Sequence, residues 1–337
     1  MVDFYKGKNV LVTGADGFIG SHLAEALVGA GAHVTALAQY NAFGTNGWLD
    51  ETAEDIRSEM EFRRGDIRDP FFAAGLTDGQ DVVFHLAALI AIPFSYEAPQ
   101  TYVDVNVTGT VNMLEAARRV GVTRFIQTST SEVYGTALFT PITEEHPLHG
   151  QSPYAASKIA ADMMSEAYAR SFDLPVFILR PFNTYGPRQS ERAVIPTVIR
   201  QALDPDCDAI RLGDLTPKRD FNFVSDTVSA FLLAGEATAI EPGVPYNAGS
   251  GTAVSIGEMV ECVQHLCGVN KPIEHEATRD RPAKSEVYEL IACAEKLTAE
   301  AGWRSAIDLD EGLKQTIDWW RGRIQSASVR RDVDFLS

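Results

Sequence analysis

The sequence of 337 residues predicts an α/β fold, in which a doubly wound parallel sheet is joined to a smaller mixed α/β lobe on its C-terminal side. Short apolar runs alternate with longer amphipathic segments over the first half of the chain, a pattern typical of β-α-β units. The first of these runs leads at once into a glycine-rich turn. From residue 181 the chain changes to loops rich in Pro, Gly and Arg, which predicts where the lobe begins.

These observations predict two units and a tail. We expect residues 1–181 to form the sheet domain, to which residues 225–248 return, and residues 182–224 with 249–325 to form the lobe. Residues 328–337 show no pattern and are expected to be the tail. The length exceeds that of most single domains, and a hydrophobic content of 45% is sufficient for a large core.

Composition restricts the partners. A net charge of −17 argues against nucleic acid or an anionic membrane as a general partner, so an anionic substrate has to be met by a local group of Arg side chains. No apolar stretch approaches the roughly eighteen residues of a membrane span, and the N-terminal residues lack the apolar core of a signal peptide. The four cysteines match no zinc-binding pattern, which indicates free thiols in a reducing cytoplasm and no metal site.

The glycine-rich turn follows the first predicted strand, Asn9–Thr13. Gly14, Gly17 and Gly20 are evenly spaced, and a helix is expected over residues 21–30. Glycines in this arrangement allow a tight turn and let main-chain N–H groups approach a phosphate at the start of the helix. Strand, turn and helix together therefore predict a site for the pyrophosphate of a dinucleotide.

The next strands offer further contacts to a dinucleotide. The second, residues 33–37, is followed by no acid to hold the ribose hydroxyls and by no Arg to take a 2′-phosphate, so NAD and NADP both remain open. In the third strand and its loop, residues 61–69, Asp66 is either an acceptor for the adenine amino group or an exposed turn residue. The fourth, residues 81–88, ends in small residues that permit close approach of a cofactor, and we interpret its His85 as a core side chain rather than a catalytic imidazole.

Two long helices are predicted over residues 102–120 and 152–171, with apolar positions that suit either a subunit interface or the core. A further strand is expected over residues 175–180. Later helices are expected over residues 227–236, 255–267 and 311–321.

Side chains that can carry chemistry follow the apolar strand at residues 124–128. Thr130, Ser131 and Glu132 come directly after it, and the end of a parallel strand is where open α/β sheets place their active sites.

A Tyr and a Lys follow on the second long helix. Tyr154 and Lys158 are four residues apart, so they share one face of that helix. A tyrosine has a reference pKa of about 10 and needs help to act as a base near neutral pH. An ammonium beside the phenol would favour its ionised form, so the pair predicts a base on this helix.

Several Arg residues lie in predicted loops of the C-terminal half: Arg188, Arg192, Arg219, Arg279 and Arg281. In so acidic a chain they are candidates for holding a diphosphate or a carboxylate. Each has an alternative interpretation as an ordinary surface residue.

Together these residues resemble the extended short-chain dehydrogenase/reductase family that modifies nucleotide-activated sugars. The resemblance extends over residues 8–325 and is carried by Gly14-x-x-Gly17-x-x-Gly20, Asp81-x-x-x-His85-Leu86-Ala87-Ala88, Asn106-Val107-x-Gly109-Thr110, Tyr154-x-x-x-Lys158, Arg180-Pro181-Phe182-Asn183 and Arg219-Asp220-Phe221. It implies a Rossmann domain that binds NAD(P), with NAD favoured, and a lobe that binds a nucleoside diphosphate sugar. It also implies a homodimer formed through the two long helices.

The resemblance assigns residues to each ligand. Those implied for the cofactor are Gly14, Gly17, Phe18, Ile19, Gly20, Asp66, Ile67, Leu86, Ala87, Ala88, Asn106, Thr128, Tyr154 and Lys158. Those implied for the substrate are Asn183, Arg188, Arg192, Val194, Arg219 and Arg281.

Within the family, Thr130-Ser131-Glu132 resembles the active sites of GDP-mannose 4,6-dehydratases and UDP-glucuronate decarboxylases. The nearest resemblance is to bacterial NAD-dependent 4,6-dehydratases of legionaminic-acid-type pathways, carried by Gly47-Trp48-Leu49-Asp50, Ile90-Ala91-Ile92-Pro93, residues 186–196 and Pro282-x-x-Ser285-Glu286-Val287. The dTDP-glucose dehydratases have Asp at the position of Ser131, so the acid role of that Asp passes here to Glu132 or to water.

For a 4,6-dehydratase the resemblance implies five catalytic residues. Tyr154 takes the proton of the carbon-4 hydroxyl while the nicotinamide takes the hydride, and Thr130 and Ser131 hydrogen-bond the oxygen. Glu132 removes the carbon-5 proton and protonates the departing carbon-6 hydroxyl. Lys158 holds the nicotinamide ribose, and return of the hydride to carbon 6 yields a 4-keto-6-deoxy sugar.

Three alternatives remain at the level of sequence. A UDP-glucuronate decarboxylase needs a cation for the sugar carboxylate, which Arg192 can supply. A nucleotide-sugar 4-epimerase needs no base at carbon 5, so Glu132 argues against it. A cofactor-sensing protein without activity has no use for an intact Thr130, Tyr154 and Lys158.

Overall fold

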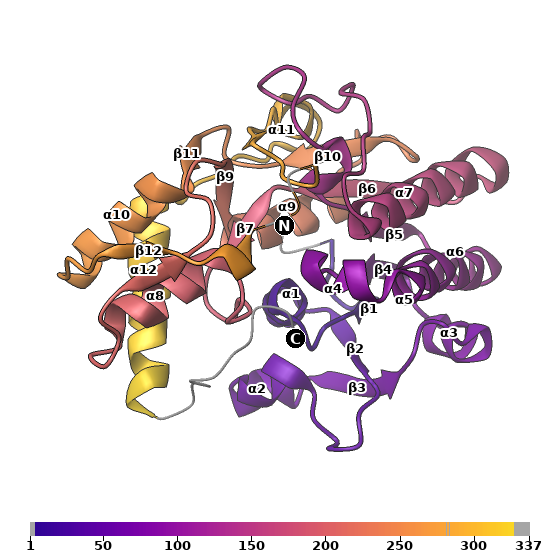
Figure 1. Ribbon diagram of the computed structural model, residues 1–337. Coiled ribbons are helices and arrows are strands. Elements are labelled where there is room, and N and C mark those ends of the chain that lie inside the picture. Colours follow the sequence, from indigo (N-terminus) through magenta and orange to yellow (C-terminus); the bar gives the residue numbers. More distant parts are fainter. Residues whose placement is uncertain (1–3, 281, 283, 327–337) are drawn as a thin grey trace.

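The computed structural model describes residues 4–280, 282 and 284–326, and its central feature is a parallel sheet (Figure 1). In this described part the sheet has seven strands in the order β10-β6-β5-β4-β1-β2-β3, and each neighbouring pair is parallel. The strands are β1 (Asn9–Thr13), β2 (His33–Gln39), β3 (Met60–Gly65), β4 (Val82–His85), β5 (Arg124–Thr128), β6 (Val176–Pro181) and β10 (Pro245–Ala248). The chain order reverses between β1 and β4, and the carboxyl ends of strands at such a point are where these sheets bind ligands. The predicted doubly wound parallel sheet is confirmed.

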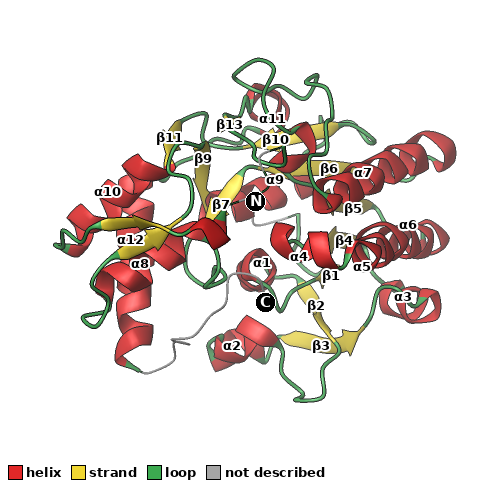
Figure 2. Ribbon diagram, viewed as in Figure 1, coloured by secondary structure: helices red, strands yellow, loops and turns green. Residues whose placement is uncertain are grey.

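Helices cover both faces of this sheet (Figures 1 and 2). Val10 and Val12 contribute to one apolar core and Leu11, between them, to the other, because successive side chains of a strand point to opposite faces. Because the strands are buried on both faces, their sequences are continuous apolar runs. The first core packs against α1 (Phe18–Gly29) and α9 (Val224–Glu236), and the second against α3 (Pro70–Thr77), α6 (Gly109–Val120) and α7 (Pro153–Phe172).

The smaller lobe is built around β9 (Lys218–Phe223). Within the described residues β9 pairs antiparallel with β11 and parallel with β13 and β7, while β8 and β12 form a separate parallel pair. These strands are β7 (Asn183–Tyr185), β8 (Ile210–Leu212), β11 (Ala253–Ser255), β12 (Ile273–His275) and β13 (Glu289–Leu290), and the helices are α8 (Val194–Leu203), α10 (Ile256–Cys267), α11 (Glu295–Ala301) and α12 (Leu309–Gln325). The lobe strands, α8 and α11 went unpredicted from sequence. For the strands the reason is that such short segments show no measurable alternation.

Short elements complete the connections. They are the single-turn or irregular helices η1 (Gly47–Glu51), α2 (Glu54–Arg57), α4 (Ile92–Glu97), α5 (Pro99–Tyr102), η2 (Val103–Thr108), η3 (Ser131–Tyr134) and η4 (Ala277–Arg279).

The helix predicted over residues 102–120 is not one regular helix. α5 runs into η2, which has π-helical hydrogen bonding, and only then into α6. The wide turn carries Asn106, whose amide accepts the Leu89 N–H at 2.8 Å and donates to the Leu89 carbonyl and to the Ser157 hydroxyl, each at 2.9 Å. These contacts to distant segments stabilise a conformation that a 3.6-residue period cannot predict.

Other boundaries also differ from the prediction: α9 begins at Val224 rather than at residue 227, and α12 spans Leu309–Gln325 rather than residues 311–321. α1 begins at Phe18 rather than at residue 21, with Gly17 as its N-cap. β4 ends at His85 rather than at residue 88, because the N–H groups of Leu86 and Ala87 turn to the Thr13 hydroxyl, at 3.1 Å each.

Membrane spans and the state of the thiols concern the chain as a whole. Over the described ranges, no helix combines the length and the apolar character needed to cross a membrane. Cys207, Cys262, Cys267 and Cys293 are free, half-buried thiols.

Gly20→Ala tests how closely α1 packs on the glycine-rich turn. An added Cβ would lie 2.1 Å from the Gly14 carbonyl oxygen, a main-chain atom that has little freedom to move. We expect the free energy of unfolding in urea to fall by about 1–3 kcal/mol, the usual cost of overpacking. Gly29→Ala in the same helix meets nothing within 4 Å. That control should be neutral or stabilising by about 0.5–1 kcal/mol, and equal effects of the two changes would contradict the packing argument.

Candidate active site

Tyr154 lies in the first turn of α7. Ser152 caps this helix by accepting the Ala155 N–H at 3.1 Å, and Pro153 occupies the first helical position, so the helix start is well defined. The Tyr154 side chain is directed inward and is only 7% exposed. Its ring packs edge-on against Tyr102, with 6.3 Å between ring centres.

Thr130 and Glu132 lie close to this phenol. Thr130 follows β5 in an extended conformation and caps η3 by accepting the Glu132 N–H at 3.3 Å, and its hydroxyl also hydrogen-bonds Tyr154. Burial raises the pKa of Tyr154 above its ordinary range, the bond with Thr130 lowers that pKa, and the negative charge of Glu132 raises it. The structure therefore brings together three of the predicted residues, with Ser131 buried beside them. Their catalytic roles remain predictions.

Lys158 is directed at the end of β5. Its buried ammonium donates to the Thr128 carbonyl at 2.6 Å. Burial lowers the pKa of Lys158 to about 8, and the negative charge of Asp162 raises it. The sequence predicted an ammonium beside the phenol, and in the structure this ammonium donates to a main-chain carbonyl at the end of β5. Its effect on that phenol remains a prediction.

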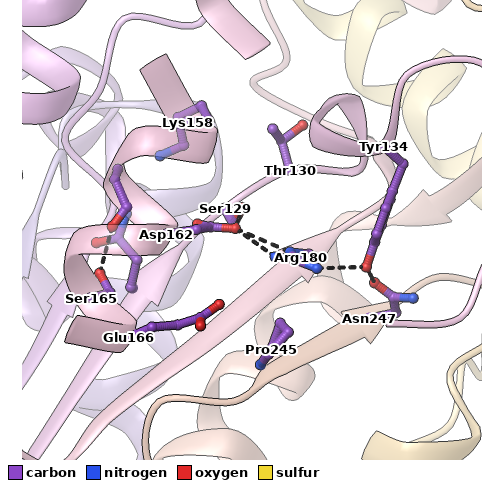
Figure 3. A network of polar contacts seen from close by, with 12 residues as sticks. Ser129, Thr130, Tyr134, Lys158, Asp162, Ser165, Glu166, Arg180, Pro245 and Asn247 are labelled. Atoms are coloured by element: carbon purple, nitrogen blue, oxygen red, sulfur yellow. Dashed lines mark hydrogen bonds and ion pairs between the residues drawn. The ribbon is translucent and has the colours of Figure 1, made fainter. Parts of the chain in front are cut away.

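A buried polar network lies behind these residues (Figure 3). Asp162 accepts the Ser129 hydroxyl at 2.7 Å and two N–H groups of Arg180, at 3.0 and 3.1 Å, through one oxygen. Arg180 also donates to the Tyr134 hydroxyl at 2.9 Å, which in turn donates to Asn247 at 2.7 Å. Asp162 and Arg180 are essentially unexposed. One network therefore connects α7, β5, β6, η3 and β10.

Sequence reasoning missed this network. Asp162 follows Lys158 by four residues, so helical spacing places both on one face of α7, and this signal was present in the sequence. The partners Ser129, Arg180 and Asn247 are brought together only by the sheet, in which β5, β6 and β10 are neighbours.

The glycine-rich turn fits the pyrophosphate of a dinucleotide. The position of a Cβ on Gly14 would be 2.8 Å from the Ala87 nitrogen, so the turn touches the segment after β4. Gly17 is exposed, and no side chain caps the N-terminus of α1, whose first residues are Phe18 and Ile19. Uncapped N–H groups at a helix start are the donors that a phosphate requires. The predicted residues of this turn thus fit the pyrophosphate of a dinucleotide.

Other candidate cofactor residues have partners in the protein. Asp66 binds Arg68 with both oxygens, and this hydrogen bond lowers its pKa. Ile67 is buried against Gly109, where an added Cβ would be 2.5 Å from its side chain. Asn106 uses its amide on Leu89 and Ser157, as described above. A direct contact of Asp66 or Asn106 with a cofactor would compete with these bonds.

The segment after β4 is held by Thr13 and His85. The Thr13 hydroxyl accepts the Leu86 and Ala87 N–H groups, so its proton points at Nδ1 of His85, 2.8 Å away. Nε2 of His85 lies 3.2 Å from the Thr110 hydroxyl. Burial lowers the pKa of His85 to about 3, which keeps the imidazole neutral. His85 is thus a core side chain, as interpreted from the sequence, and Ala88 follows it half-buried.

The Arg residues predicted to bind substrate are separated. Arg188 reaches back to α1, where it donates to Ser21 at 3.2 Å and pairs with Glu25 at 2.8 Å. Arg219 is buried and pairs with Glu286 at 3.0 Å.

Among the described members of this set, Arg192 is the one whose charge affects a residue beside Tyr154. Its charge lowers the pKa of Tyr102, which burial raises to about 12, and Tyr102 touches Tyr154. Asn183 and Val194 begin β7 and α8, where the lobe meets the sheet domain, and Arg281 lies outside the described residues.

Comparison with known proteins identifies the family. A family profile described as GDP-mannose 4,6 dehydratase matches residues 11–316. The chain belongs to this family. It is 34% identical to the dTDP-glucose 4,6-dehydratase of Actinoplanes sp., over 93% of this chain and 97% of that protein. It is also 32% identical to the UDP-glucose 4-epimerase of Mycolicibacterium smegmatis, over 94% and 99%.

Solved structures agree with this assignment. The dTDP-glucose 4,6-dehydratase DesIV of Streptomyces venezuelae, whose structure has NAD bound, superposes with a TM-score of 0.84 and 32% identity over 94% of this chain and 98% of that one. The protein is thus an enzyme of the NAD-dependent dehydratase and epimerase type that acts on nucleotide sugars, as the sequence predicted at this level.

Asp162→Asn tests the buried ion pair. The amide keeps the shape of the side chain but leaves Arg180 without an anion, and breaking a buried pair typically costs about 3–5 kcal/mol. We expect a loss of that size in the free energy of unfolding, measured in urea.

The charge of Asp162 that raises the pKa of Lys158 is also lost in Asp162→Asn, so this pKa should fall below about 8. NAD⁺ affinity should then begin to decline at lower pH than in the wild type, because the ammonium is lost earlier.

Glu166→Gln is the matched control. It removes the same charge from the same helix, but Glu166 pairs with Arg170, which is largely exposed. Exposed pairs contribute little, so a loss under about 1 kcal/mol is expected. If both variants lost equal stability, the special importance of Asp162 would be refuted.

Proposed function

We propose that this enzyme is an NAD-dependent nucleotide-sugar 4,6-dehydratase, which converts a nucleoside diphosphate hexose or N-acetylhexosamine to its 4-keto-6-deoxy product. The observation that carries the proposal is the position of Glu132 in η3, where its N–H donates at 3.3 Å to Thr130, the residue that hydrogen-bonds Tyr154. A carboxylate on the segment that also carries Thr130 supplies the second base that a dehydratase needs in addition to the base at carbon 4.

The first step concerns carbon 4 of the sugar. A proton at carbon 5 is not acidic until carbon 4 has become a ketone. Tyr154 takes the proton of the carbon-4 hydroxyl, and Thr130, which already hydrogen-bonds Tyr154, holds the oxygen. A bound nicotinamide would accept the hydride from carbon 4 and later return it to carbon 6.

The second step is the elimination of water across carbons 5 and 6. Glu132 removes the carbon-5 proton, and the electrons of that bond form the carbon-5 to carbon-6 double bond as the hydroxyl leaves carbon 6. The same carboxyl gives its proton to the departing oxygen, so one group serves as base and then as acid. Ser131, buried next to Glu132, assists Thr130 in holding the substrate oxygen.

A UDP-glucuronate decarboxylase is the second candidate function. It is favoured by the position of Arg192, whose charge reaches Tyr102 beside Tyr154. A cation there suits a sugar carboxylate at carbon 5. In this reaction the oxidation at carbon 4 is the same, but carbon dioxide leaves instead of water.

Product masses discriminate between these activities. The protein is incubated with a panel of nucleotide sugars, which includes UDP-, GDP- and dTDP-linked hexoses and UDP-glucuronate. Loss of water marks a dehydratase and loss of carbon dioxide a decarboxylase. An unchanged mass with a changed configuration at carbon 4 would mark an epimerase and overturn the proposal.

Within the dehydratases, we propose that the enzyme belongs to the group of legionaminic-acid-type pathways. This proposal predicts turnover of a nucleotide-linked N-acetylhexosamine.

We also propose a homodimer formed through η2, α6 and α7. Val103 on η2 and Met163 on α7 are 45% and 42% exposed, which leaves apolar surface on these helices for a second copy. Light scattering at micromolar concentration should give twice the mass of one chain. A single species of one chain's mass would refute this assembly.

Glu132→Gln separates oxidation from elimination. The amide keeps the size of the side chain but cannot accept the carbon-5 proton, so overall turnover should fall by about 10²–10⁴-fold. Formation of reduced nicotinamide in a single turnover, followed by absorbance, should remain. Exchange of the carbon-5 proton with deuterated solvent should be lost in this variant, in parallel with the loss of turnover. Exchange at the wild-type rate would show that Glu132 is not the base.

Two comparisons make this experiment specific. Glu145→Gln makes the same chemical change in an exposed residue of the segment between β5 and α7, and should leave turnover unchanged. Tyr154→Phe should instead prevent the formation of reduced nicotinamide.

A further inference from the structure

The end of β2 lacks the acid that dinucleotide-binding sheets commonly place there. β2 ends at Gln39, and no Asp or Glu occurs over residues 39–49. In related folds an acid at this point holds the hydroxyls of the adenosine ribose and disfavours a 2′-phosphate. The usual determinant of cofactor choice is therefore missing from its usual position.

A carboxylate reaches the same place from another segment. The Gln39 N–H donates to Oδ2 of Asp16 at 3.2 Å. Asp16 directly precedes Gly17, the N-cap of α1, so it lies between the end of β2 and the helix start that fits the pyrophosphate. Its other oxygen, Oδ1, has no partner on another residue in the described part of the chain, and the side chain is half-exposed.

The loop after β2 holds Asp16 in this position. The Trp48 N–H donates to the Asp16 carbonyl at 3.1 Å, and a Cβ on Gly47 would be 2.4 Å from that carbonyl. Trp48 packs against Trp319 of α12, with 5.6 Å between ring centres, and the Arg323 guanidinium lies 4.9 Å from the Trp48 ring. Contacts from the sheet domain and from the lobe therefore restrict the turn that carries the Asp16 carboxylate.

We propose that Asp16 binds the adenosine ribose and selects NAD over NADP, taking the role of the acid that β2 lacks. The inference rests on the proposed function only in that the enzyme uses a nicotinamide dinucleotide. The free oxygen can accept a hydrogen bond from a ribose hydroxyl, whereas a 2′-phosphate would place negative charge against the carboxylate.

One nearby cation, Arg64, would favour NADP rather than NAD. Arg64 of β3 pairs in register with Ala38, next to Gln39, and would attract a 2′-phosphate. Its side chain is exposed, so salt and water screen its charge more than that of the half-buried Asp16. Asp16 therefore decides the preference.

The test measures binding rather than activity. Cofactor is removed from the purified protein, and the dissociation constants of NADH and NADPH are measured by fluorescence titration for the wild type, Asp16→Asn and Asp16→Ser. The wild type should bind NADH at least about tenfold more tightly than NADPH. Both variants should reduce this ratio by about tenfold, chiefly through tighter binding of NADPH. Asn retains an acceptor for the Gln39 N–H, so its fold should be preserved, which thermal unfolding checks.

Asp55→Asn is the matched control, since it removes one exposed negative charge from α2, outside the turn, and should leave the ratio unchanged. A wild type that binds NADPH as tightly as NADH, or an Asp16→Asn variant with an unchanged ratio, would overturn the proposal. The dehydratase proposal can fail independently. In that case the Asp16 variants would still change the ratio of NADH to NADPH affinity, but the wild type would eliminate no water from any nucleotide sugar.

Discussion

The ion pair between Asp162 and Arg180 is the interaction on which the arrangement of the site depends. Both groups are removed from water, and a buried charge is tolerated only when it is paired and hydrogen-bonded. The partners lie on α7 and β6, and Ser129 adds the end of β5. Because each of these groups would be costly to leave unpaired, the helix that carries Tyr154 and Lys158 has one favourable position relative to β5, the strand that Thr130 follows.

Buried carboxylates hold the lobe together by the same principle. Asp220 on β9 accepts the N–H groups of Ser250, Gly251 and Ala292, and Asp226 on α9 accepts those of Ala306 and Ile307. Main-chain N–H groups of loops have no sheet or helix partner, so a carboxylate that accepts several of them stabilises loop conformations that would otherwise be open to water. The lobe has short strands, and these side chains replace part of the order that longer strands provide.

Burial also determines the electrostatics of the candidate site. It raises the pKa of Tyr154 and lowers that of Lys158 to about 8, so in both cases the neutral form is favoured. A phenol in such surroundings is a poor base on its own, and the hydrogen bond from Thr130 lowers its pKa. In the proposed function, a charged Lys158 and the bound substrate would have to favour the ionised phenol for Tyr154 to act as the base.

The sequence by itself determined the parallel α/β fold, the glycine-rich turn and the placement of Tyr154 and Lys158 on one face of a helix. All of these depend on local spacing: continuous apolar runs, glycines at a strand–helix turn, and residues one helical turn apart. Only the tertiary structure decided which distant groups meet. It directed Lys158 to the Thr128 carbonyl, paired Asp162 with Arg180, and turned Arg188 toward α1.

Asp16 illustrates the same division. From the sequence the end of β2 lacked an acid, and NAD and NADP could not be distinguished. The carboxylate comes instead from a residue 23 positions earlier, through a hydrogen bond to Gln39. Sequence patterns report the periodicity of one segment at a time, whereas the charge at a ligand site is the sum over segments that the fold brings together, and that sum exists only after the chain has folded.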